Sequence, residues 1–149
     1  MGQVNISKRA AKRIRTGHIW VYKSDVRELR EVDAGAIVTV FDEANNFVGQ
    51  AFYSDRSEIA LRFLTTRREQ LDRDWWRARL QACAELRANI ARDTNAYRLV
   101  YSEGDLLPSL IVDLYEAGFI PWRLVASRSV EEGDNEFVVL LAKDQASGG

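Results

Sequence analysis

Apolar and polar residues alternate with a period of two along residues 58–64, which place Ile59, Leu61 and Phe63 on one face. Alternation of this kind predicts a β-strand that buries one face. Residues 36–41 and 47–53, the second with a central Gly49, are two further candidate strands. Residues 42–46 and 54–57, which are rich in Asp, Asn and Ser, have the composition of tight turns. Short strands joined by close turns favour a compact module similar to a small β-barrel.

A short helix is predicted ahead of these strands. Ser7 suits its N-cap, because a serine side chain can accept a hydrogen bond from the free N–H groups of a first helical turn. The residues that follow place Ala10, Ala11 and Ile14 on one narrow apolar face. Gly17 suits the end of the helix, because glycine readily adopts the left-handed conformation often found there.

Residues 18–22 are expected to leave this helix as an extended segment. Trp20 and Tyr22 then lie on the same side of it, because side chains alternate along a strand. A shared side favours at least one of these rings in the core, and Trp20 is the better candidate for a core anchor than for a base-stacking surface. Residues 25–34, which are charged and without a clear period, predict an irregular connection.

The composition changes after Thr66, where a helical period begins. Asp72 is a suitable N-cap for a helix that runs to Arg92. The predicted apolar side of this helix contains Trp76, Leu80, Cys83, Leu86 and Ile90. A second small domain is therefore expected, with residues 67–70 as the hinge between the two.

Four further strands are predicted beyond this helix. Residues 96–101 and 109–114 form one pair of candidates, and residues 122–127 and 136–142 form a candidate hairpin. The turn 102–108 between the first two is acidic and contains a glycine and a proline. Such a composition is typical of a solvated loop.

Charge is separated along the chain. Residues 1–24 contain six cations and no carboxylate, although the formal net charge of the whole chain is -1. The cations are Lys8, Arg9, Lys12, Arg13, Arg15 and Lys23. Cations on a helix beside exposed rings suit a polyanion, whose phosphates pair with the charges and whose bases stack on the rings. The alternative is a solvated helix face beside core aromatics.

Several classes of protein do not fit this composition. No run of about 18 apolar residues predicts a membrane span, and Met1 is not followed by the apolar core of a signal peptide. A cytoplasmic protein that does not bind a membrane is therefore expected. A single cysteine and a single histidine cannot form a Cys/His zinc site, so no metal is expected.

Five sequence segments carry a resemblance to a known family. They are Gly17–Tyr22, Gly49–Tyr53, Ser57–Leu64, Ala96–Val100 and Ser102–Tyr115. The first three are similar to the N-terminal PUA domain of the RlmI-like ribosomal RNA large-subunit (cytosine-5) methyltransferases. The last two are similar to the small α/β domain that follows it in this family. Ile19 departs from the proline usual in the corresponding turn.

The resemblance implies an α+β fold. It consists of a small PUA-like β-barrel followed by a partial α/β domain of EEHEE-like topology. The implied boundaries are residues 1–68 for the PUA-like RNA-binding domain and residues 69–115 for the partial central domain. Residues 116–149 do not resemble the continuation of the family and are expected to be an unrelated tail.

The resemblance also implies a function. The family transfers a methyl group from S-adenosylmethionine to cytosine in ribosomal RNA, with a Rossmann-like domain after the central one. We expect a truncated member that lacks this domain, because residues 116–149 contain no glycine-rich turn after a strand. The implied role is to bind ribosomal RNA. No cofactor is expected in this chain, and whether it is an enzyme is left open. The alternative is a protein-interaction module that forms a homodimer.

Two groups of residues suggest catalysis, and neither fits well. Methyl transfer to carbon 5 of cytosine uses a cysteine thiolate in this family, but Cys83 lies mid-helix on the apolar side, which favours a core residue. Glu103, Asp105 and Asp113 suggest acid–base chemistry of a hydrolase, but an acidic turn is more simply a solvated loop. We therefore predict no catalytic residue.

The RNA-contact candidates are cations and rings of the first domain. They are Lys8, Lys12, Arg13, Arg15, His18, Tyr22, Arg56 and Arg62. Cations near phosphates supply affinity that falls with salt and carries no sequence information. For His18, contact with RNA and packing against the first helix are both left open.

Overall fold

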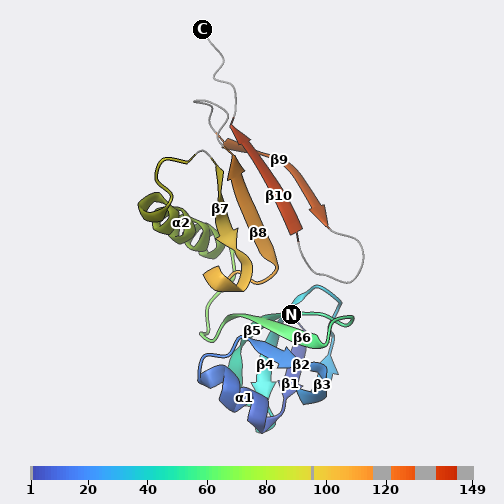
Figure 1. Ribbon diagram of the computed structural model, residues 1–149. Coiled ribbons are helices and arrows are strands. Elements are labelled where there is room, and N and C mark those ends of the chain that lie inside the picture. The colour runs from blue at the N-terminus through green and yellow to red at the C-terminus, as the bar shows by residue number, and fades with distance from the viewer. Residues whose placement is uncertain (1, 95, 116–121, 130–136, 144–149) are drawn as a thin grey trace. The chain divides into compact units, whose positions relative to one another are not determined.

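The computed structural model describes residues 2–94, 96–115, 122–129 and 137–143, in two units that divide between Glu69 and Gln70 (Figure 1). Each unit has its own sheet and its own hydrophobic core. The turn predicted between the last two strands lies outside the described residues.

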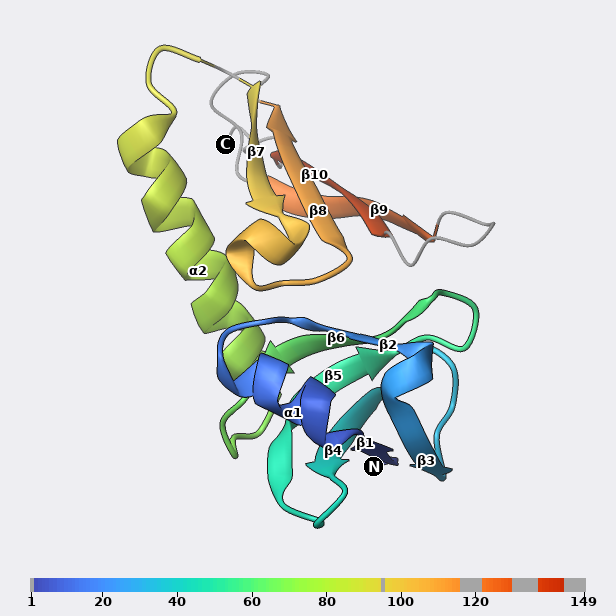
Figure 2. The ribbon, with the colours of Figure 1, turned by 60° about the horizontal axis from the view of Figure 1, so that its bottom comes forward.

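The first unit is a curled six-stranded sheet with one α-helix against it and a short 3₁₀-helix, Lys23–Asp25, between two of its strands (Figure 2). Its strands are β1 (Gln3–Ile6), β2 (Trp20–Tyr22), β3 (Val26–Arg30), β4 (Ile37–Asp42), β5 (Phe47–Tyr53) and β6 (Ile59–Thr65). Their order across the sheet is β2-β6-β5-β4-β1-β3. Neighbouring strands are antiparallel except β1 and β4, which are parallel. Helix α1 (Lys8–Arg15) contacts β4 and β5.

Helix α1 forms as predicted, and its narrow apolar face joins the core of the sheet. Ala10, Ala11 and Ile14 are buried together with apolar residues of β1, β2, β4, β5 and β6. The Ser7 hydroxyl accepts a hydrogen bond from the Ala10 N–H at 3.1 Å and so caps the helix. Gly17 follows with φ +101°, in the left-handed region that favours glycine.

The irregular connection predicted for residues 25–34 is wrong, because Val26–Arg30 forms the edge strand β3. Four of its five side chains are exposed, so its sequence lacks the alternation of a half-buried strand. Strand β1, which pairs with it, was also missed. Val4, Asn5 and Ile6 are all buried, and a strand buried on both faces shows no period of two either.

Gly49 lies in the middle of β5, where strand β6 approaches closely. A Cβ atom at this position would collide with the carbonyl oxygen of Thr65 and would lie 2.8 Å from a ring carbon of Phe63. The pairing of β5 with β6 is irregular one residue further on, between Gln50 and Ala51. This close approach of two strands explains why a glycine interrupts an otherwise apolar strand.

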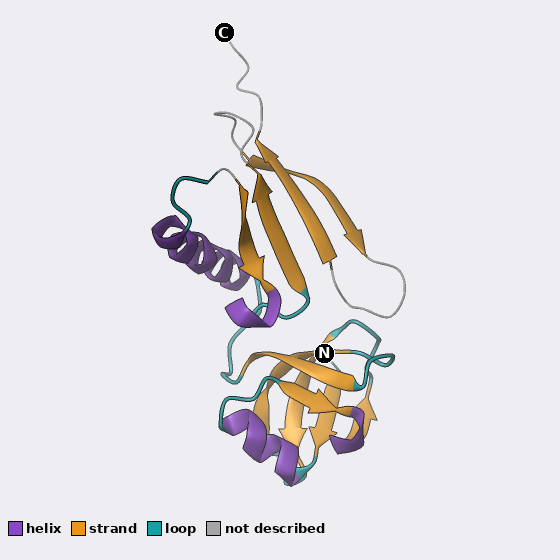
Figure 3. Cartoon of the chain, viewed as in Figure 1, coloured by secondary structure: helices purple, strands orange, loops and turns teal. Residues whose placement is uncertain are grey.

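The part of the second unit that the structure describes consists of one α-helix, a short 3₁₀-helix at Ser102–Asp105 and a four-stranded sheet (Figure 3). Its elements are α2 (Arg73–Ile90), β7 (Ala96–Tyr101), β8 (Leu110–Tyr115), β9 (Trp122–Ser129) and β10 (Phe137–Lys143). The strand order is β7-β8-β10-β9. The pairs β7–β8 and β9–β10 are antiparallel, as predicted for β9 and β10, whereas β8 and β10 are parallel.

Helix α2 begins as predicted, but its apolar side is only partly buried. The Asp72 carboxylate accepts hydrogen bonds from the N–H groups of Asp74 and Trp75. Cys83 is buried with Val100, Leu107 and Val112, and Trp75 and Trp76 pack against them. Leu86 and Ile90 were predicted on this face but are 49% and 68% exposed. Spacing identifies a helix face, but it does not show how far along the helix the core extends.

The acidic turn is more ordered than a solvated loop. The Asp105 side chain is 7% exposed and accepts two hydrogen bonds from Arg87, at 2.8 and 2.6 Å. The Tyr101 N–H donates to the same carboxylate at 2.6 Å. Burial raises the pKa of Asp105, but the hydrogen bonds from Arg87 and Tyr101 outweigh it, so the pKa is lowered. Asp105 therefore ties the turn to α2.

Candidate nucleic-acid interface

Strand β2 lies at one edge of the six-stranded sheet and carries two exposed rings. Trp20 is 37% exposed and Tyr22 is 38% exposed, whereas Val21 between them is fully buried. The prediction that one of these rings is a core anchor is wrong. Val21, which lies opposite Leu61 of β6, takes the core position, and alternation then directs both rings outward.

Arginine residues from two neighbouring elements lie beside β2. The Arg13 guanidinium, from the last turn of α1, lies 5.7 Å from the centroid of the Tyr22 ring. Arg62 of β6 is the residue opposite Trp20 in the antiparallel pair. Its guanidinium donates to the Ile59 carbonyl at 3.3 Å and to the Ser57 hydroxyl at 3.4 Å, which limits its motion. The structure thus places Arg13 of α1 at the Tyr22 ring and Arg62 of β6 on the strand next to β2.

A buried carboxylate positions the basic face of α1. Asp25 is 2% exposed and accepts a hydrogen bond from the Ser7 hydroxyl at 2.7 Å and from Arg9 at 3.1 Å. Arg13 lies 3.9 Å from the other carboxylate oxygen. The hydrogen bond from Ser7 lowers the pKa of Asp25, burial opposes it, and Arg9 and Arg13 lower it further. An ionised Asp25 therefore directs two guanidinium groups toward the β2 side of the helix.

The remaining predicted cations have different environments. Lys8 and Lys12, one turn apart on α1, are exposed and make no ion pair with any residue that the structure describes. His18 is exposed in the turn that leads into β2. Arg56 is exposed beyond β5, and its carbonyl oxygen accepts a hydrogen bond from the Lys23 ammonium at 3.4 Å. Lys23 is therefore another cation close to β2, and it was not among the RNA contacts predicted from the sequence.

Arg15 differs from these cations because it is held by a carboxylate. Its guanidinium donates to the Oδ2 atom of Asp42 at 2.7 Å. The Oδ1 atom of Asp42 accepts hydrogen bonds from the N–H groups of Ala44 and Asn46, at 3.0 and 2.9 Å. The Arg15 hydrogen bond, followed by those from the turn, lowers the pKa of Asp42 to about 2. Arg15 thus joins the end of α1 to the β4–β5 turn.

The low pKa of Asp42 predicts a loss of stability in acid. The folded state holds this carboxyl ionised, whereas the unfolded state binds its proton below the ordinary pKa of 3.8. The stabilisation is therefore complete above about pH 4 and falls as the pH approaches about 2, by on the order of 1–2 kcal/mol. Urea unfolding across this range measures it. An Asp42→Asn variant should be less stable at neutral pH and show a flatter acid dependence, and an unchanged acid dependence would contradict the assignment.

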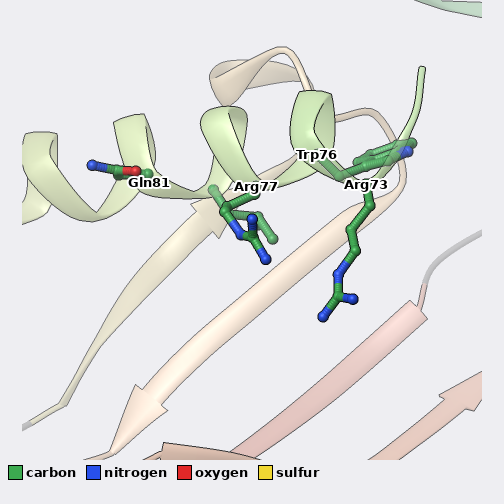
Figure 4. Close-up of a pocket in the computed structure, with 5 residues that line it drawn as sticks. Arg73, Trp76, Arg77 and Gln81 are labelled. Carbon is green, nitrogen blue, oxygen red and sulfur yellow. The ribbon is translucent and has the colours of Figure 1, made fainter. Parts of the chain in front are cut away.

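A hollow of about 500 Å³ lies along α2 in the second unit. Its lining residues are Arg73, Trp76, Arg77, Leu80 and Gln81 (Figure 4). The side chains of Arg73 and Arg77 extend from the helix in the same direction in this view. Two cations and a ring are able to contact an anion, but this lining provides no carboxylate, thiol or imidazole for acid–base or nucleophilic chemistry.

The candidates for catalysis and metal binding have structural roles in the described part of the chain. Burial, and then the charge of Asp105, raise the pKa of the Cys83 thiol, although Arg87 and Arg79 oppose the shift. A buried thiol with a raised pKa is a poor nucleophile. Among residues 2–94 and 96–114, no three His, Cys, Asp or Glu side chains are grouped to hold a metal ion. No helix in the described ranges is long and apolar enough to cross a membrane.

Comparison with known proteins gives matches for both units. A family model for a PUA-like domain matches residues 4–66. A ribosomal RNA large subunit methyltransferase of Deinococcus radiodurans is 39% identical over 130 residues, which cover 82% of this chain and 32% of the relative. Ribosomal RNA large subunit methyltransferase I of Alteromonas mediterranea is 35% identical over 118 residues, 76% of this chain and 30% of that protein. The chain thus spans about a third of the length of these relatives.

A solved structure from Streptococcus mutans supports the same fold. This protein, described as a candidate SAM-dependent methyltransferase, matches with a TM-score of 0.63 and 20% sequence identity. The match covers 78% of this chain and 34% of the solved chain. The α+β fold expected from the sequence, with a curled PUA-like sheet, is confirmed. The chain belongs to the family of the RlmI-like ribosomal RNA large subunit methyltransferases, and its residues 4–66 are a PUA-like domain.

Proposed function

We propose that these 149 residues bind ribosomal RNA through the exposed surface of α1 and β2. This α1–β2 surface comprises Lys8, Arg9, Lys12, Arg13, Trp20, Tyr22, Lys23, Arg56 and Arg62. The observation that carries the proposal is the Arg13 guanidinium at 5.7 Å from the exposed ring of Tyr22. Most cations of this surface come from residues 1–24, which contain no carboxylate. The names of the relatives support ribosomal RNA as the polyanion.

The residues of this surface have distinct proposed roles. Lys8 and Lys12 extend into solvent and supply phosphate contacts, as point charges on flexible stems. Arg13 is held by Asp25 and Tyr22 and supplies a phosphate contact of fixed direction. His18 and Arg15 flank the surface, where each contributes at most a peripheral contact.

We propose further that these residues do not transfer a methyl group by themselves. Cys83 is buried, Asp105 is paired with Arg87, and the sequence contains no glycine-rich turn between a strand and a helix that would cradle S-adenosylmethionine. In this proposal the chain contributes RNA recognition to a reaction whose methyl donor is bound elsewhere. A cytoplasmic location, where ribosomal RNA is available, belongs to the same proposal.

Two measurements on the purified 149-residue chain test this function. Fluorescence anisotropy with fragments of large-subunit ribosomal RNA should detect binding whose affinity falls as salt rises. Incubation of the same mixture with isotopically labelled S-adenosylmethionine should give no labelled RNA. Absence of binding, or affinity independent of salt, would contradict RNA recognition by this surface. Methyl transfer with turnover would contradict the non-catalytic part.

The interaction-module alternative is favoured by one observation in the second unit. Leu86 and Ile90 of α2 are 49% and 68% exposed, and Leu80 on the same helix is 36% exposed. Apolar side chains gathered on one helix can form a contact between two copies of a chain. Sedimentation equilibrium over a range of protein concentrations distinguishes the alternatives, because a chain that stays monomeric and binds RNA does not require this contact.

A further inference from the structure

The spacing of the two exposed rings on β2 is informative about the kind of RNA that fits them. Trp20 and Tyr22 lie two residues apart on the outward side of a strand. Along a strand this separation is about 6.7 Å, which is twice the rise of about 3.4 Å between stacked nucleotides in one strand of a duplex. The two rings therefore match bases that are splayed apart, and they do not match the continuous stack of a helix.

A duplex would leave these rings without suitable partners. The bases of an RNA helix are stacked in its interior, and its deep, narrow major groove does not admit side chains. Only phosphates and sugars would reach an outward surface of this kind, and their recognition requires cations rather than an indole. Unpaired nucleotides, in contrast, offer base faces that stack on aromatic rings regardless of sequence.

The cations near the rings are arranged for a single strand that follows β2. Arg13 lies beside the Tyr22 ring, and Arg62 occupies the position opposite Trp20 in the neighbouring strand. One guanidinium thus lies at the Tyr22 ring, and a second cation comes from the strand beside Trp20, with its guanidinium held by Ser57 and Ile59. An apolar protein partner would cover the rings but would also desolvate the exposed cations Lys8 and Lys12 of the same surface.

From these observations we infer that the α1–β2 surface takes unpaired RNA, with one base stacked on Trp20 and a second on Tyr22. This inference rests on the proposed RNA-binding function and specifies its substrate class. Trp20 is then a residue that determines specificity for unpaired over paired RNA. It is absent from the set of contacts predicted from the sequence.

The test compares one RNA sequence of about 12 nucleotides in two states, unpaired and in a duplex with its complement. At equal salt, the chain should bind the unpaired form about tenfold more tightly, the factor expected for stacked bases. Trp20→Leu should lower affinity for the unpaired form about tenfold and leave the duplex unaffected. The dependence of affinity on salt should not change, because no charge is removed. Trp20→Phe keeps a ring and should retain most of the affinity.

Tyr101 provides a matched control, because it is an exposed ring on β7 in the other unit, 58% exposed. Tyr101→Leu should leave both affinities unchanged. Equal affinity for the two RNA forms, or a loss on Trp20→Leu that is the same for both, would overturn the inference while RNA binding itself stands. No binding of either form would overturn the proposed function instead. If Trp20→Leu lowers the melting temperature of the chain, its affinities are not interpretable. The test then rests on the affinities of the unmodified chain and of Trp20→Phe for unpaired and duplex RNA, and equal affinities for the two forms would overturn the inference.

Discussion

Replacing Lys8, Lys12 and Arg13 together by alanine is expected to weaken RNA binding about 100-fold at about 0.1 M salt. Each cation that neutralises a phosphate of a single strand contributes about 0.7 to the slope of log affinity against log salt, so the slope should flatten by about 2. Between about 0.1 M and about 1 M salt, a slope difference of about 2 corresponds to a difference in affinity of about 100-fold, which is the loss expected at about 0.1 M. Anisotropy titrations at several salt concentrations measure both quantities.

The choice of these three cations follows from their environments. Lys8 and Lys12 are exposed, and Arg13 is held toward Tyr22. Arg15 is left unchanged because its hydrogen-bonded ion pair with Asp42, at 2.7 Å, supports the fold. Asp25, in contrast, keeps its hydrogen bonds from Ser7 and Arg9 when Arg13 is removed.

A second triple variant, with alanine at the α2 residues Arg73, Arg77 and Arg79, removes the same charge from the other unit. It should leave the salt slope within about 0.5 of the original. Equal losses in the two triple variants would mean that net charge, rather than the α1–β2 surface, governs binding.

Asp105→Ala is expected to destabilise the second unit by about 3–5 kcal/mol. The carboxylate and the Arg87 guanidinium have side chains only 7% and 16% exposed, so removal of one leaves the other charge largely buried. Arg87 would retain one described partner, the Arg98 carbonyl at 3.2 Å, and the Tyr101 N–H would lose its acceptor. Hydrogen exchange of the backbone amides in β7 and β8 under native conditions measures the free energy of opening in this unit.

Asp113 offers a closely matched comparison in the same sheet. It also receives two hydrogen bonds from one arginine, Arg98, at 2.8 and 3.2 Å. The two side chains of this pair are 35% and 41% exposed, so Asp113→Ala should cost at most about 1 kcal/mol. If Asp105→Ala and Asp113→Ala lower the free energy of opening by the same amount, the burial of the Asp105–Arg87 pair is not the reason for its contribution to stability.

The parts of the fold that sequence reasoning predicted correctly are those with local signals. Helix α1 was recognisable because Ser7 and Gly17 mark its ends and three apolar residues share its inner face. Strands β5 and β7 were predicted with the bounds that the structure shows, because turn residues enclose an apolar run. Strands β1 and β3 lack such signals, since one is buried on both faces and the other is mostly exposed.

The candidate interface was predictable in its charges but not in its geometry. The absence of carboxylates before Asp25 is visible in the sequence. The burial of Asp25 against Ser7 joins residues 18 positions apart, and it depends on how the chain returns to the start of α1. The sequence shows that Trp20 and Tyr22 lie on the same side of their strand, but it does not show whether that side faces the core. In the structure the core contains Val21, the smaller residue, and both rings are exposed.

The position of β1 affects how the first unit folds. Although β1 is the first strand along the chain, it lies between β3 and β4, with Gln3 beside both Arg30 and Thr39. Its partners are therefore distant in sequence, and the entropy of closing those loops must be overcome before the pairings stabilise the sheet. Because α1 follows β1 directly, the helix can be fixed in its final orientation only after β4 is available. We therefore expect the basic surface on α1 to assemble late in folding, so that an incompletely folded chain carries its cations without presenting them as one site.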